Sequence, residues 1–324
     1  MELIPPTGDA TIAGGAGAAP TARPLAATVR RVDFGGIALF DPAGGSFTAT
    51  ARGKLMGRKK SLGNAVVVGD VVRLEWEGER AMVVGVEPRR TAFSRRASGE
   101  RPEEQVVAAN LDQVVVVASL HRPDFSHGLV DRVLAQADVA GLPSLLALNK
   151  TDLGDAAEAA ALLADYAPAG VRGVATCAVT GRGVDELREA CRGLRTLFVG
   201  HSGVGKSTLL ERLAPGHELL RGDVNQVTGK GRHTTTAALL LRPEPDLELI
   251  DTPGVRAFGL WGVDADDLAE HYPELAPHLG GCRFSDCRHD REPGCALHAA
   301  LERGEIPARR WESFRHLREE LAGE

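Results

Sequence analysis

A phosphate-binding loop is the clearest chemical feature of the 324-residue sequence. Residues 200–208 match the pattern G-x-x-x-x-G-K-[ST] between an apolar run and a helical pattern over Ser207–Leu213. Glycines let backbone N–H groups converge on phosphate, and a helix N-terminus adds a favourable dipole. We expect Lys206 to contact the β- and γ-phosphates, with a catalytic role, and Ser207 to bind magnesium; a glycine-rich turn without nucleotide is the alternative. The predicted phosphate-site residues are Gly200, His201, Ser202, Gly203, Val204, Gly205, Lys206, Ser207 and Thr208.

A carboxylate after a second apolar run provides another phosphate-site signal. Asp251-Thr252-Pro253-Gly254 follows Leu247–Ile250, and ligands collect at the carboxyl ends of strands in α/β sheets. We expect Asp251 to hold magnesium through water and the Gly254 N–H to approach the γ-phosphate. Because an Asp before Pro-Gly is also an ordinary turn, this prediction depends on the phosphate loop.

The segment Asn149-Lys150-Thr151-Asp152 carries the chemistry for reading a guanine base. The Asp152 carboxylate can accept hydrogen bonds from guanine N1–H and N2–H₂, whereas adenine presents an acceptor at N1. An unpaired charged hydrogen bond costs about 1.5–3 kcal/mol, which favours GTP over ATP by roughly tenfold to a hundredfold. Lys150 can lie along the base, and Asn149 can tie neighbouring loops together. A helix-capping turn is the alternative for an isolated N-K-x-D.

A weaker base-site signal follows the predicted strand Gly173–Cys177. There the N–H of Ala178, next to Cys177, can reach guanine O6. GTPases ordinarily place the phosphate loop before the base-reading loops, but here Asn149 and Cys177 precede Gly200. The order of the motifs is therefore circularly permuted.

The polar stretch 229–236 suits a mobile switch segment between the two phosphate signals. Thr234 or Thr235 can close onto GTP and its magnesium, Thr235 being the predicted ligand; an edge strand rich in threonine is the alternative. Val255 stands where many GTPases carry a glutamine that orients the attacking water. We therefore predict slow intrinsic hydrolysis that a partner accelerates, with His233 as a candidate substitute; a solvent-exposed histidine is the alternative.

Three cysteines and a histidine crowd together near the C-terminus. The spacing Cys282-x₄-Cys287-x-His289-x₅-Cys295 provides the closed ligand set typical of one structural zinc ion. His298 is a reserve ligand, and free buried cysteines are the alternative. We expect zinc to fold this part of the chain and to take no part in catalysis.

Periodicity predicts the elements that position these residues. Short β runs at Ala27–Val32, Gly36–Phe40, Phe47–Ala51, Ala65–Val67, Val71–Trp76 and Ala81–Val86 suggest a small closed barrel. After a polar linker at about 95–105, apolar strands at Val114–Ala118, Ser144–Leu148, Gly173–Cys177 and Thr196–Val199 alternate with helical patterns at Leu129–Ala140, Ala156–Ala164 and Val184–Cys191. This predicts a doubly wound α/β domain. Leu239–Leu241 and Leu247–Ile250 add two strands, and a final helix spans about 307–321.

Composition limits the partners and the location. The net charge of −6 gives no general attraction to nucleic acid, but residues 26–100 carry thirteen Lys or Arg against eight Asp or Glu. A local patch suggests RNA binding by the barrel, a spacer barrel without ligand being the alternative; its residues are Arg52, Lys54, Arg58, Lys59 and Lys60. Residues 1–26 read as a flexible tail, and no run is long enough to span a membrane, which indicates a cytoplasmic protein.

With these motifs in hand, the chain resembles the circularly permuted GTPases of small ribosomal subunit biogenesis, the RsgA or YjeQ family. Further matching segments are 52–55 (Arg-Gly-Lys-Leu), 68–71 (Val-Gly-Asp-Val), 110–112 (Asn-Leu-Asp) and 231–236 (Gly-Arg-His-Thr-Thr-Thr). The resemblance implies an OB-fold barrel at 27–100, a permuted P-loop GTPase domain at 101–263 and a helical zinc-binding domain at 264–324. It also implies small-subunit rRNA as partner and activator. Cys177 replaces a serine that is common in the family, and the tail is longer than expected.

The leading hypothesis is an RNA-activated GTPase that checks or remodels the maturing small subunit, acting as a monomer on GTP with Mg²⁺. A second treats the chain as an RNA-binding scaffold whose nucleotide is only a conformational latch. A third is an ATP-dependent enzyme that reuses the phosphate loop, against which Asp152 argues.

Overall fold

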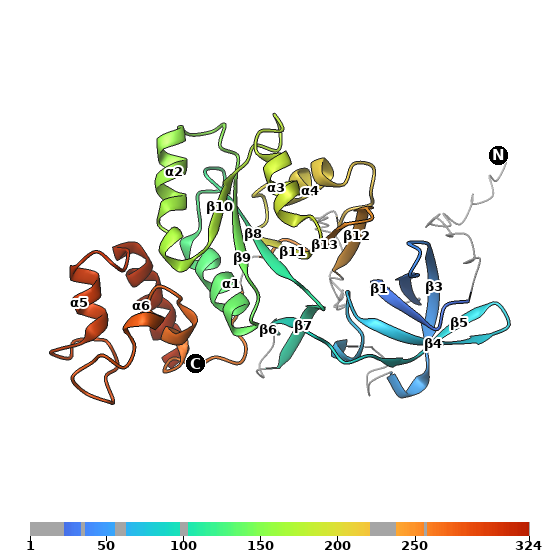
Figure 1. The fold of residues 1–324 in the computed structure, drawn as a ribbon, viewed down its shortest axis with the longest axis horizontal. Helices are drawn as coiled ribbons and strands as arrows, with labels where there is room; N and C mark the ends of the chain where they lie inside the picture. Colours follow the sequence, from blue (N-terminus) through green and yellow to red (C-terminus); the bar gives the residue numbers. More distant parts are fainter. Residues whose placement is uncertain are drawn as a thin grey trace, which may run out of the picture.

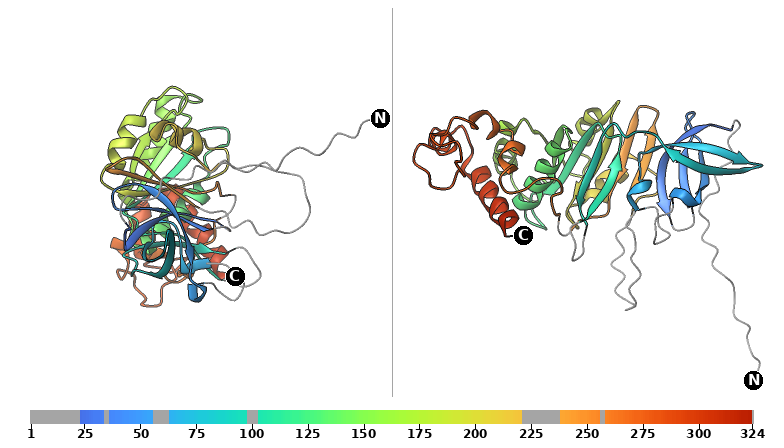
Figure 2. Two further views of the ribbon diagram at one scale, coloured as in Figure 1. Left: turned by 90° about the vertical axis from the view of Figure 1, so that its right-hand side faces the viewer. Right: turned by 90° about the horizontal axis from the view of Figure 1, so that it is seen from below.

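The computed structural model describes residues 23–33, 36–55, 63–97, 103–220, 238–255 and 258–323. They form three units in a row: a β-barrel, a central α/β unit and a helical C-terminal unit (Figures 1 and 2). This confirms the predicted fold class. Of the predicted tail, residues 23–26 are described, and the Pro24 carbonyl accepts a hydrogen bond from Trp76 Nε1 at 2.9 Å.

The barrel closes because its first strand pairs with both the second and the fourth. Its strands run in the order β1-β2-β3-β5-β4, namely β1 (Ala26–Asp33), β2 (Gly36–Phe40), β3 (Ser46–Ala51), β5 (Arg80–Val86) and β4 (Val71–Glu77). Alternate residues such as Val29, Leu39 and Leu74 point into a common core. The predicted strand Ala65–Val67 is wrong. Gly63–Ala65 forms a 3₁₀ turn, and the Val67 N–H is held by the Asp70 carboxylate at 2.8 Å.

The predicted linker at 95–105 is also wrong, because residues at both of its ends belong to strands. Two antiparallel strands, β6 (Ala92–Arg96) and β7 (Glu104–Ala109), pair there with Phe93 opposite Ala108. Both of these side chains are fully buried. Their burial stabilises the two strands although the charged residues around them suggested a linker.

The central sheet places the phosphate-loop strand in the middle. Its order is β10-β9-β8-β11-β13-β12, with every neighbouring pair parallel except β12 and β13. The strands are β8 (Gln113–Ser119), β9 (Ser144–Asn149), β10 (Arg172–Ala175), β11 (Arg195–Gly200), β12 (Leu239–Glu244) and β13 (Leu247–Asp251). The carboxyl ends of β9, β11 and β13 therefore meet at one edge, where the predicted motifs follow them.

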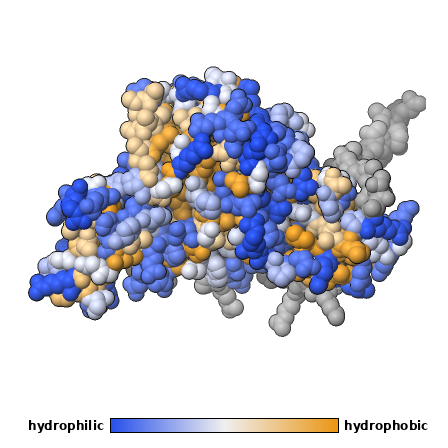
Figure 3. Space-filling view, in the orientation of Figure 1, coloured by the Kyte–Doolittle hydropathy of each residue, from blue (hydrophilic) through white to orange (hydrophobic). Residues whose placement is uncertain are grey.

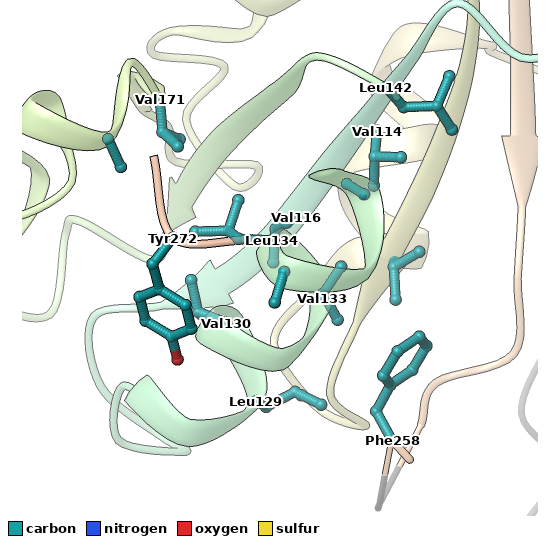
Figure 4. Packing of buried hydrophobic residues seen from close by; sticks show 14 of the residues in the cluster. Val114, Val116, Leu129, Val130, Val133, Leu134, Leu142, Val171, Phe258 and Tyr272 are labelled. Atoms are coloured by element: carbon teal, nitrogen blue, oxygen red, sulfur yellow. The ribbon is translucent and has the colours of Figure 1, made fainter. Parts of the chain in front are cut away.

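Successive side chains of each strand point to opposite faces of the sheet, so a hydrophobic core forms on each face. Val114 and Val116 of β8 pack toward α1 (His127–Val139), whereas Val115 and Val117 join the core that contains α3 (Val184–Cys191) and α4 (Lys206–Leu213). Figure 4 shows Val130 and Leu134 of α1 among these residues, close to Tyr272 from the C-terminal unit. Helix α2 (Ala156–Ala164) packs near β9 and β10. Helices on both faces make the unit doubly wound.

The C-terminal unit shares the core on the α1 face. Its helices are α5 (Ala296–Glu302) and α6 (Ala308–Ala322), preceded by 3₁₀ turns at Leu268–His271 and Ala276–His278. Trp311 and Phe314 of α6 belong to the same buried cluster as α1. Arg310, buried beside them, forms ion pairs with Asp131 of α1 and with Glu274.

The barrel is attached to the central unit at the strand ends opposite the motifs. Arg195, the first residue of β11, donates to the Gly69 carbonyl at 2.8 Å and pairs with Glu248 at 2.6 Å.

Figure 3 shows polar residues spread over all three units on the face that is turned toward the viewer in Figure 1, with a hydrophobic area over the barrel. Among the described residues, no helix is both long enough and apolar enough to cross a membrane.

Candidate functional site

The phosphate loop joins the end of β11 to the start of α4. Gly205 immediately precedes the helix with φ of 89°, and a Cβ added there would lie 2.4 Å from Asn149 Nδ2. A side chain at this position would therefore be strained and would collide with the neighbouring loop. The loop has the conformation and the clearance that close approach of a phosphate requires.

Lys206 and Asp251 form a buried ion pair at the head of the loop. Asp251 is fully buried, and its second carboxylate oxygen accepts the Leu220 N–H at 3.0 Å. The lysine assigned to phosphate and the carboxylate assigned to magnesium are thus brought together, as their predicted roles require. For both roles to be filled, each must exchange its present partner for the phosphate or the metal.

The D-x-x-G segment runs directly beside the phosphate loop. A Cβ on Gly254 would lie 3.0 Å from the Ser202 Cα, and the Val255 N–H donates to the Gly200 carbonyl at 3.1 Å. The Thr252 hydroxyl donates to the Phe198 carbonyl at 2.7 Å. These contacts explain why a small residue stands at 254. The side chain of the next residue, Val255, is apolar and buried in the core on the α1 face.

Asn149 joins the phosphate loop to both base-reading segments. Its Nδ2 donates to the Val204 carbonyl at 3.0 Å, and its Oδ1 accepts the Ala178 N–H at 3.0 Å and the Thr176 hydroxyl at 3.3 Å. The side chain is 1% exposed, so each of these bonds is made away from water. Because the Ala178 N–H already donates to Asn149, its predicted contact with guanine O6 requires that this bond be shared or exchanged.

Asp152 is exposed at the same edge and has a defined hydrogen-bond partner. The Cys177 thiol donates to its Oδ1 at 3.1 Å. This hydrogen bond and the residue's own backbone N–H lower the pKa of Asp152, with smaller contributions from Arg182 and Lys150. At neutral pH the group is an ionised acceptor, which is the state that can accept two hydrogen bonds from guanine.

Lys150 lies between the base-reading segment and the phosphate loop. Its φ of 58° is in the left-handed region that non-glycine residues seldom occupy. Its Nζ donates to the Gly203 carbonyl at 2.7 Å and to the Arg122 carbonyl. The lysine stem therefore crosses toward the phosphate loop, as a residue lying along a base would.

Part of the predicted site lies outside the described residues. This applies to His233, Thr234 and Thr235 of the switch, to Arg58, Lys59 and Lys60 of the basic patch, and to the Lys54 side chain. Of the patch, Arg52 is described; it is exposed and pairs with Glu75 at 2.8 Å. The RNA-binding role of the patch stays a prediction.

The four expected zinc ligands come together. The Sγ atoms of Cys282, Cys287 and Cys295 and a ring nitrogen of His289 all lie within 4.8 Å of one another. His289 Nδ1 is 3.5 Å from Cys282 Sγ and 3.4 Å from Cys295 Sγ. Three thiolates and one imidazole at this spacing suit tetrahedral zinc. His298, the reserve ligand, instead contacts the His289 carbonyl through Nε2 at 3.3 Å and packs on Trp311.

Several residues of the site were missed from the sequence. Arg182 Nη2 donates to the Thr151 hydroxyl at 2.6 Å and carbonyl at 3.2 Å, and Arg212 contacts the loop that follows Cys177. Leu220 reaches Asp251 through its backbone alone. Surface arginines and backbone amides carry no motif, so only folding reveals these contacts. A cleft of about 570 Å³ between the barrel and β12 contains none of the predicted nucleotide-site residues.

Comparison with known families and sequences gives consistent matches. A family model described as RsgA GTPase matches residues 86–261. The small ribosomal subunit biogenesis GTPase RsgA of Gemmatimonas aurantiaca is 40% identical over 291 residues, covering 88% of this chain and 94% of that protein. The protein of the same name from Pseudomonas aeruginosa is 44% identical over 259 residues, covering 78% of this chain and 75% of its own.

Solved structures show the same architecture. YjeQ from Thermotoga maritima superposes with a TM-score of 0.73 at 27% identity, covering 93% of this chain and 99% of its own. YloQ, described as a circularly permuted GTPase, superposes with a TM-score of 0.68 at 21% identity, covering 92% of this chain and 95% of its own. At the latter identity the likeness concerns the fold alone.

Proposed function

Since the chain belongs to the RsgA GTPase family, we propose that it hydrolyses GTP to GDP and phosphate as a late-stage maturation factor of the small ribosomal subunit. We further propose that it binds the rRNA of that subunit and is activated by it. The relatives' names describe GTPases of small-subunit biogenesis. These names favour repeated GTP hydrolysis over the alternative in which the nucleotide serves only as a conformational latch.

The Asn149 junction is the observation that carries this proposal. One buried side chain bonds to the phosphate loop at Val204 and to the base-reading loop at Ala178, both at 3.0 Å. A single guanine nucleotide is the ligand that needs these two loops side by side, because its phosphates and its base would occupy one loop each. The permuted order of the motifs does not disturb this arrangement.

Each residue of the proposed site has a chemical role. Lys206 and the loop amides would bind the phosphates, and Asp152 would select guanine. The residues that would hold magnesium are Ser207, Asp251 and Thr235, and the ion, when bound, neutralises charge on the phosphates. The ion pair between Lys206 and Asp251 supports the phosphate role of the lysine and the magnesium role of the carboxylate.

Water positioning lacks a polar side chain at position 255, where many GTPases carry a glutamine. Val255 is buried and apolar, so it cannot orient the attacking water. We propose that His233 supplies this function once the ribosomal subunit is bound. Turnover of His233→Ala with and without small subunits tests the assignment, and stimulated turnover equal to that of the natural chain rules it out.

We propose a structural role for the zinc site and an RNA-binding role for the barrel. The closed set of Cys282, Cys287, His289 and Cys295 has the composition of structural zinc centres. The barrel's basic residues would neutralise rRNA phosphates. We propose that the protein acts in the cytoplasm, where its proposed partner is assembled, and that it acts as a monomer.

The test is GTP hydrolysis by the purified chain with small ribosomal subunits, with large subunits and with neither. We expect slow turnover alone, acceleration of at least about tenfold by small subunits, and none by large ones. Lys206→Ala serves as the background control because it lacks the phosphate-binding charge. Equal rates in all three conditions would remove the proposed activation, and rates equal to the control would remove the activity.

A further inference from the structure

Arg182 stands in a tight turn between two glycines. The backbone of Gly181 has φ of 88° and that of Gly183 has φ of 73°, both in the left-handed region that glycine adopts without strain. A Cβ on Gly183 would lie 2.1 Å from the Ala175 carbonyl oxygen, and the Arg182 carbonyl accepts the Cys177 N–H at 2.9 Å. The turn therefore folds back tightly against the end of β10, which fixes the point from which the arginine side chain starts.

The Arg182 side chain binds the residue directly before Asp152. Its Nη2 donates to both oxygens of Thr151, to the hydroxyl at 2.6 Å and to the carbonyl at 3.2 Å. Thr151 is 4% exposed, and its hydroxyl and N–H donate to the Thr176 carbonyl at 2.8 Å and 3.3 Å. The threonine is thus held from two sides, by the end of β10 and by the arginine, which lies 31 residues later in the chain.

The Thr151 carbonyl belongs to the peptide group that leads into Asp152. Because a peptide group is planar, holding its carbonyl also fixes the direction in which the next residue begins. Asp152 is itself exposed, so its carboxylate depends on such neighbours for a defined direction. The pKa of Asp152 is lowered first by the Cys177 thiol and further by the charge of Arg182, which places the guanidinium near the carboxylate as well.

We propose that Arg182 is a positioning residue for guanine selection, which holds Thr151 so that the Asp152 carboxylate is directed at N1 and N2 of the base. The inference rests on the proposed GTP site and adds one residue to it. Arg182 acts through Thr151 and Asp152, and needs no contact with the nucleotide. Fixing the carboxylate before the nucleotide arrives lowers the cost of binding, and this gain concerns the base alone.

The first test replaces Arg182 with glutamine and measures the affinities for GDP, for IDP and for inorganic tripolyphosphate by titration calorimetry. IDP lacks the exocyclic amino group of guanine, so it offers the carboxylate one hydrogen bond instead of two. A misdirected carboxylate keeps one bond more easily than two. We therefore expect GDP binding to weaken about threefold to tenfold, while IDP and tripolyphosphate binding stay within about twofold.

The matched control is Arg172→Gln. Arg172, the first residue of β10, forms an exposed ion pair with Glu186 at 2.9 Å, and all three affinities should stay unchanged when it is replaced. A purely structural role of Arg182 would weaken GDP and IDP binding equally. An unchanged preference for GDP over IDP in Arg182→Gln would therefore overturn the proposal.

The second test asks whether Arg182 acts through Asp152. Arg182→Lys keeps the charge and can donate to one of the two oxygens, so it should recover part of the lost GDP affinity. In the Asp152→Ala background no carboxylate remains to be directed, and Arg182→Gln should change GDP affinity by less than about twofold. Full additivity of the two substitutions would show that they act independently and would overturn the positioning role.

Failure of the proposed function would look different. If the natural chain bound GDP no more tightly than ADP, the guanine site itself would be wrong, whatever the variants did. If the natural chain preferred GDP and Arg182→Gln kept the full preference over IDP, only the role of Arg182 would be wrong. Retained tripolyphosphate binding shows in each variant that the phosphate loop is folded.

Discussion

At the edge of the sheet that we propose to read guanine, single side chains connect neighbouring loops. The side chain of Asn149 bonds to two loops and holds them together, and the Cys177 thiol donates to the carboxylate that would meet the base. Because these bonds are formed within the protein, the site is organised before a nucleotide arrives. Such preorganisation reduces the free-energy cost of binding.

Asp152→Asn tests base selection by replacing only the carboxylate with an amide. The amide NH₂ would face the guanine donors, so we expect GTP affinity to fall by roughly tenfold to a hundredfold and binding of xanthosine triphosphate to improve. Both affinities can be measured by fluorescence titration. Asp155→Asn is the control: Asp155 caps α2 through the Glu158 N–H at 2.7 Å, and asparagine caps equally well. An unchanged preference in Asp152→Asn would contradict the assignment.

Only residues whose type and spacing are fixed by chemistry can be recognised in the sequence as a motif. Lys206, Asp251 and Asn149 could be predicted as site residues because phosphate and base chemistry fix their types and spacing. Arg182 and Arg212 were missed, since an arginine that donates to a backbone carbonyl can stand at many positions with no characteristic neighbours. The direct Lys206–Asp251 pair could not be predicted either, because it depends on how two strand ends meet.

At the scale of elements, α6 is anchored on α1 by charges buried with their partners. Arg310 is 2% exposed, pairs with Asp131 and Glu274, and lies over the Tyr166 and Tyr272 rings. Burial raises the pKa of Asp131, and the Arg310 charge opposes that rise. Removal of one partner from such a cluster leaves uncompensated charge in the interior.

Arg310→Met should therefore destabilise the docked C-terminal unit by about 3–5 kcal/mol. Chemical denaturation, with hydrogen exchange to locate the loss, provides the measurement. Arg315→Ala, which removes an exposed pair with Glu319 at 3.5 Å, is the control and should cost about 0.5 kcal/mol or less. Equal effects of the two substitutions would mean that the buried cluster does not anchor α6.

The contact between His127 and α6 should make stability depend on pH. Arg309 Nε donates to His127 Nε2 at 2.8 Å, while Nδ1 contacts the Tyr166 hydroxyl at 3.2 Å. Burial, then Arg309 and Arg310, lowers the pKa of His127 to about 4. Between about pH 6.5 and that value the unfolded chain binds a proton that the folded chain excludes, so this contribution to stability is complete above pH 6.5 and is lost as the pH falls toward 4.

His127→Gln should remove that component, since glutamine keeps an acceptor for Arg309 but does not titrate. The measurement is the denaturation midpoint of both chains from pH 7.5 to pH 4.5, with zinc present throughout. The natural chain should lose more stability than the variant over this range. Parallel curves would assign the acid sensitivity to other groups.

The zinc centre can be tested by stoichiometry and by its effect on folding. Metal analysis should give one zinc per chain, and chelation should release it and reduce hydrogen-exchange protection over residues 282–302. Cys295→Ser should lower zinc content, whereas His298→Ala should keep it, because His298 contacts the His289 backbone and Trp311. Chelation that released no zinc, or left protection unchanged, would refute a structural metal.

Prediction of elements succeeded where periodicity was strong. Ala156–Ala164 and Val184–Cys191 were predicted with the bounds that the structure gives. It failed where a few residues decide between a strand and a turn, as at Val67, whose N–H is held by Asp70. It also failed for β6 and β7, because the charged residues between Phe93 and Val106 suggested a linker rather than two paired strands.

At the scale of the whole molecule, three units lie in a row, with the central sheet between the barrel and the helical C-terminal unit (Figure 2). Arg195 connects the phosphate-loop strand to the barrel, and Arg310 connects α1 to the C-terminal unit. Both neighbours therefore contact elements that lead to the nucleotide edge. The unit types were predictable from motif and pattern, but these junctions were not, since they depend on residues distant in sequence. The predicted domain boundaries remain predictions.

The central claim is that segments from Asn149 to Gly254 surround one guanine nucleotide. A crystal structure with magnesium and a non-hydrolysable GTP analogue is its most direct test. It should show the Asp152 carboxylate about 3 Å from guanine N1 and N2, with the phosphates at Lys206. Phosphates bound at Lys206 with the base far from Asp152 would contradict the claim.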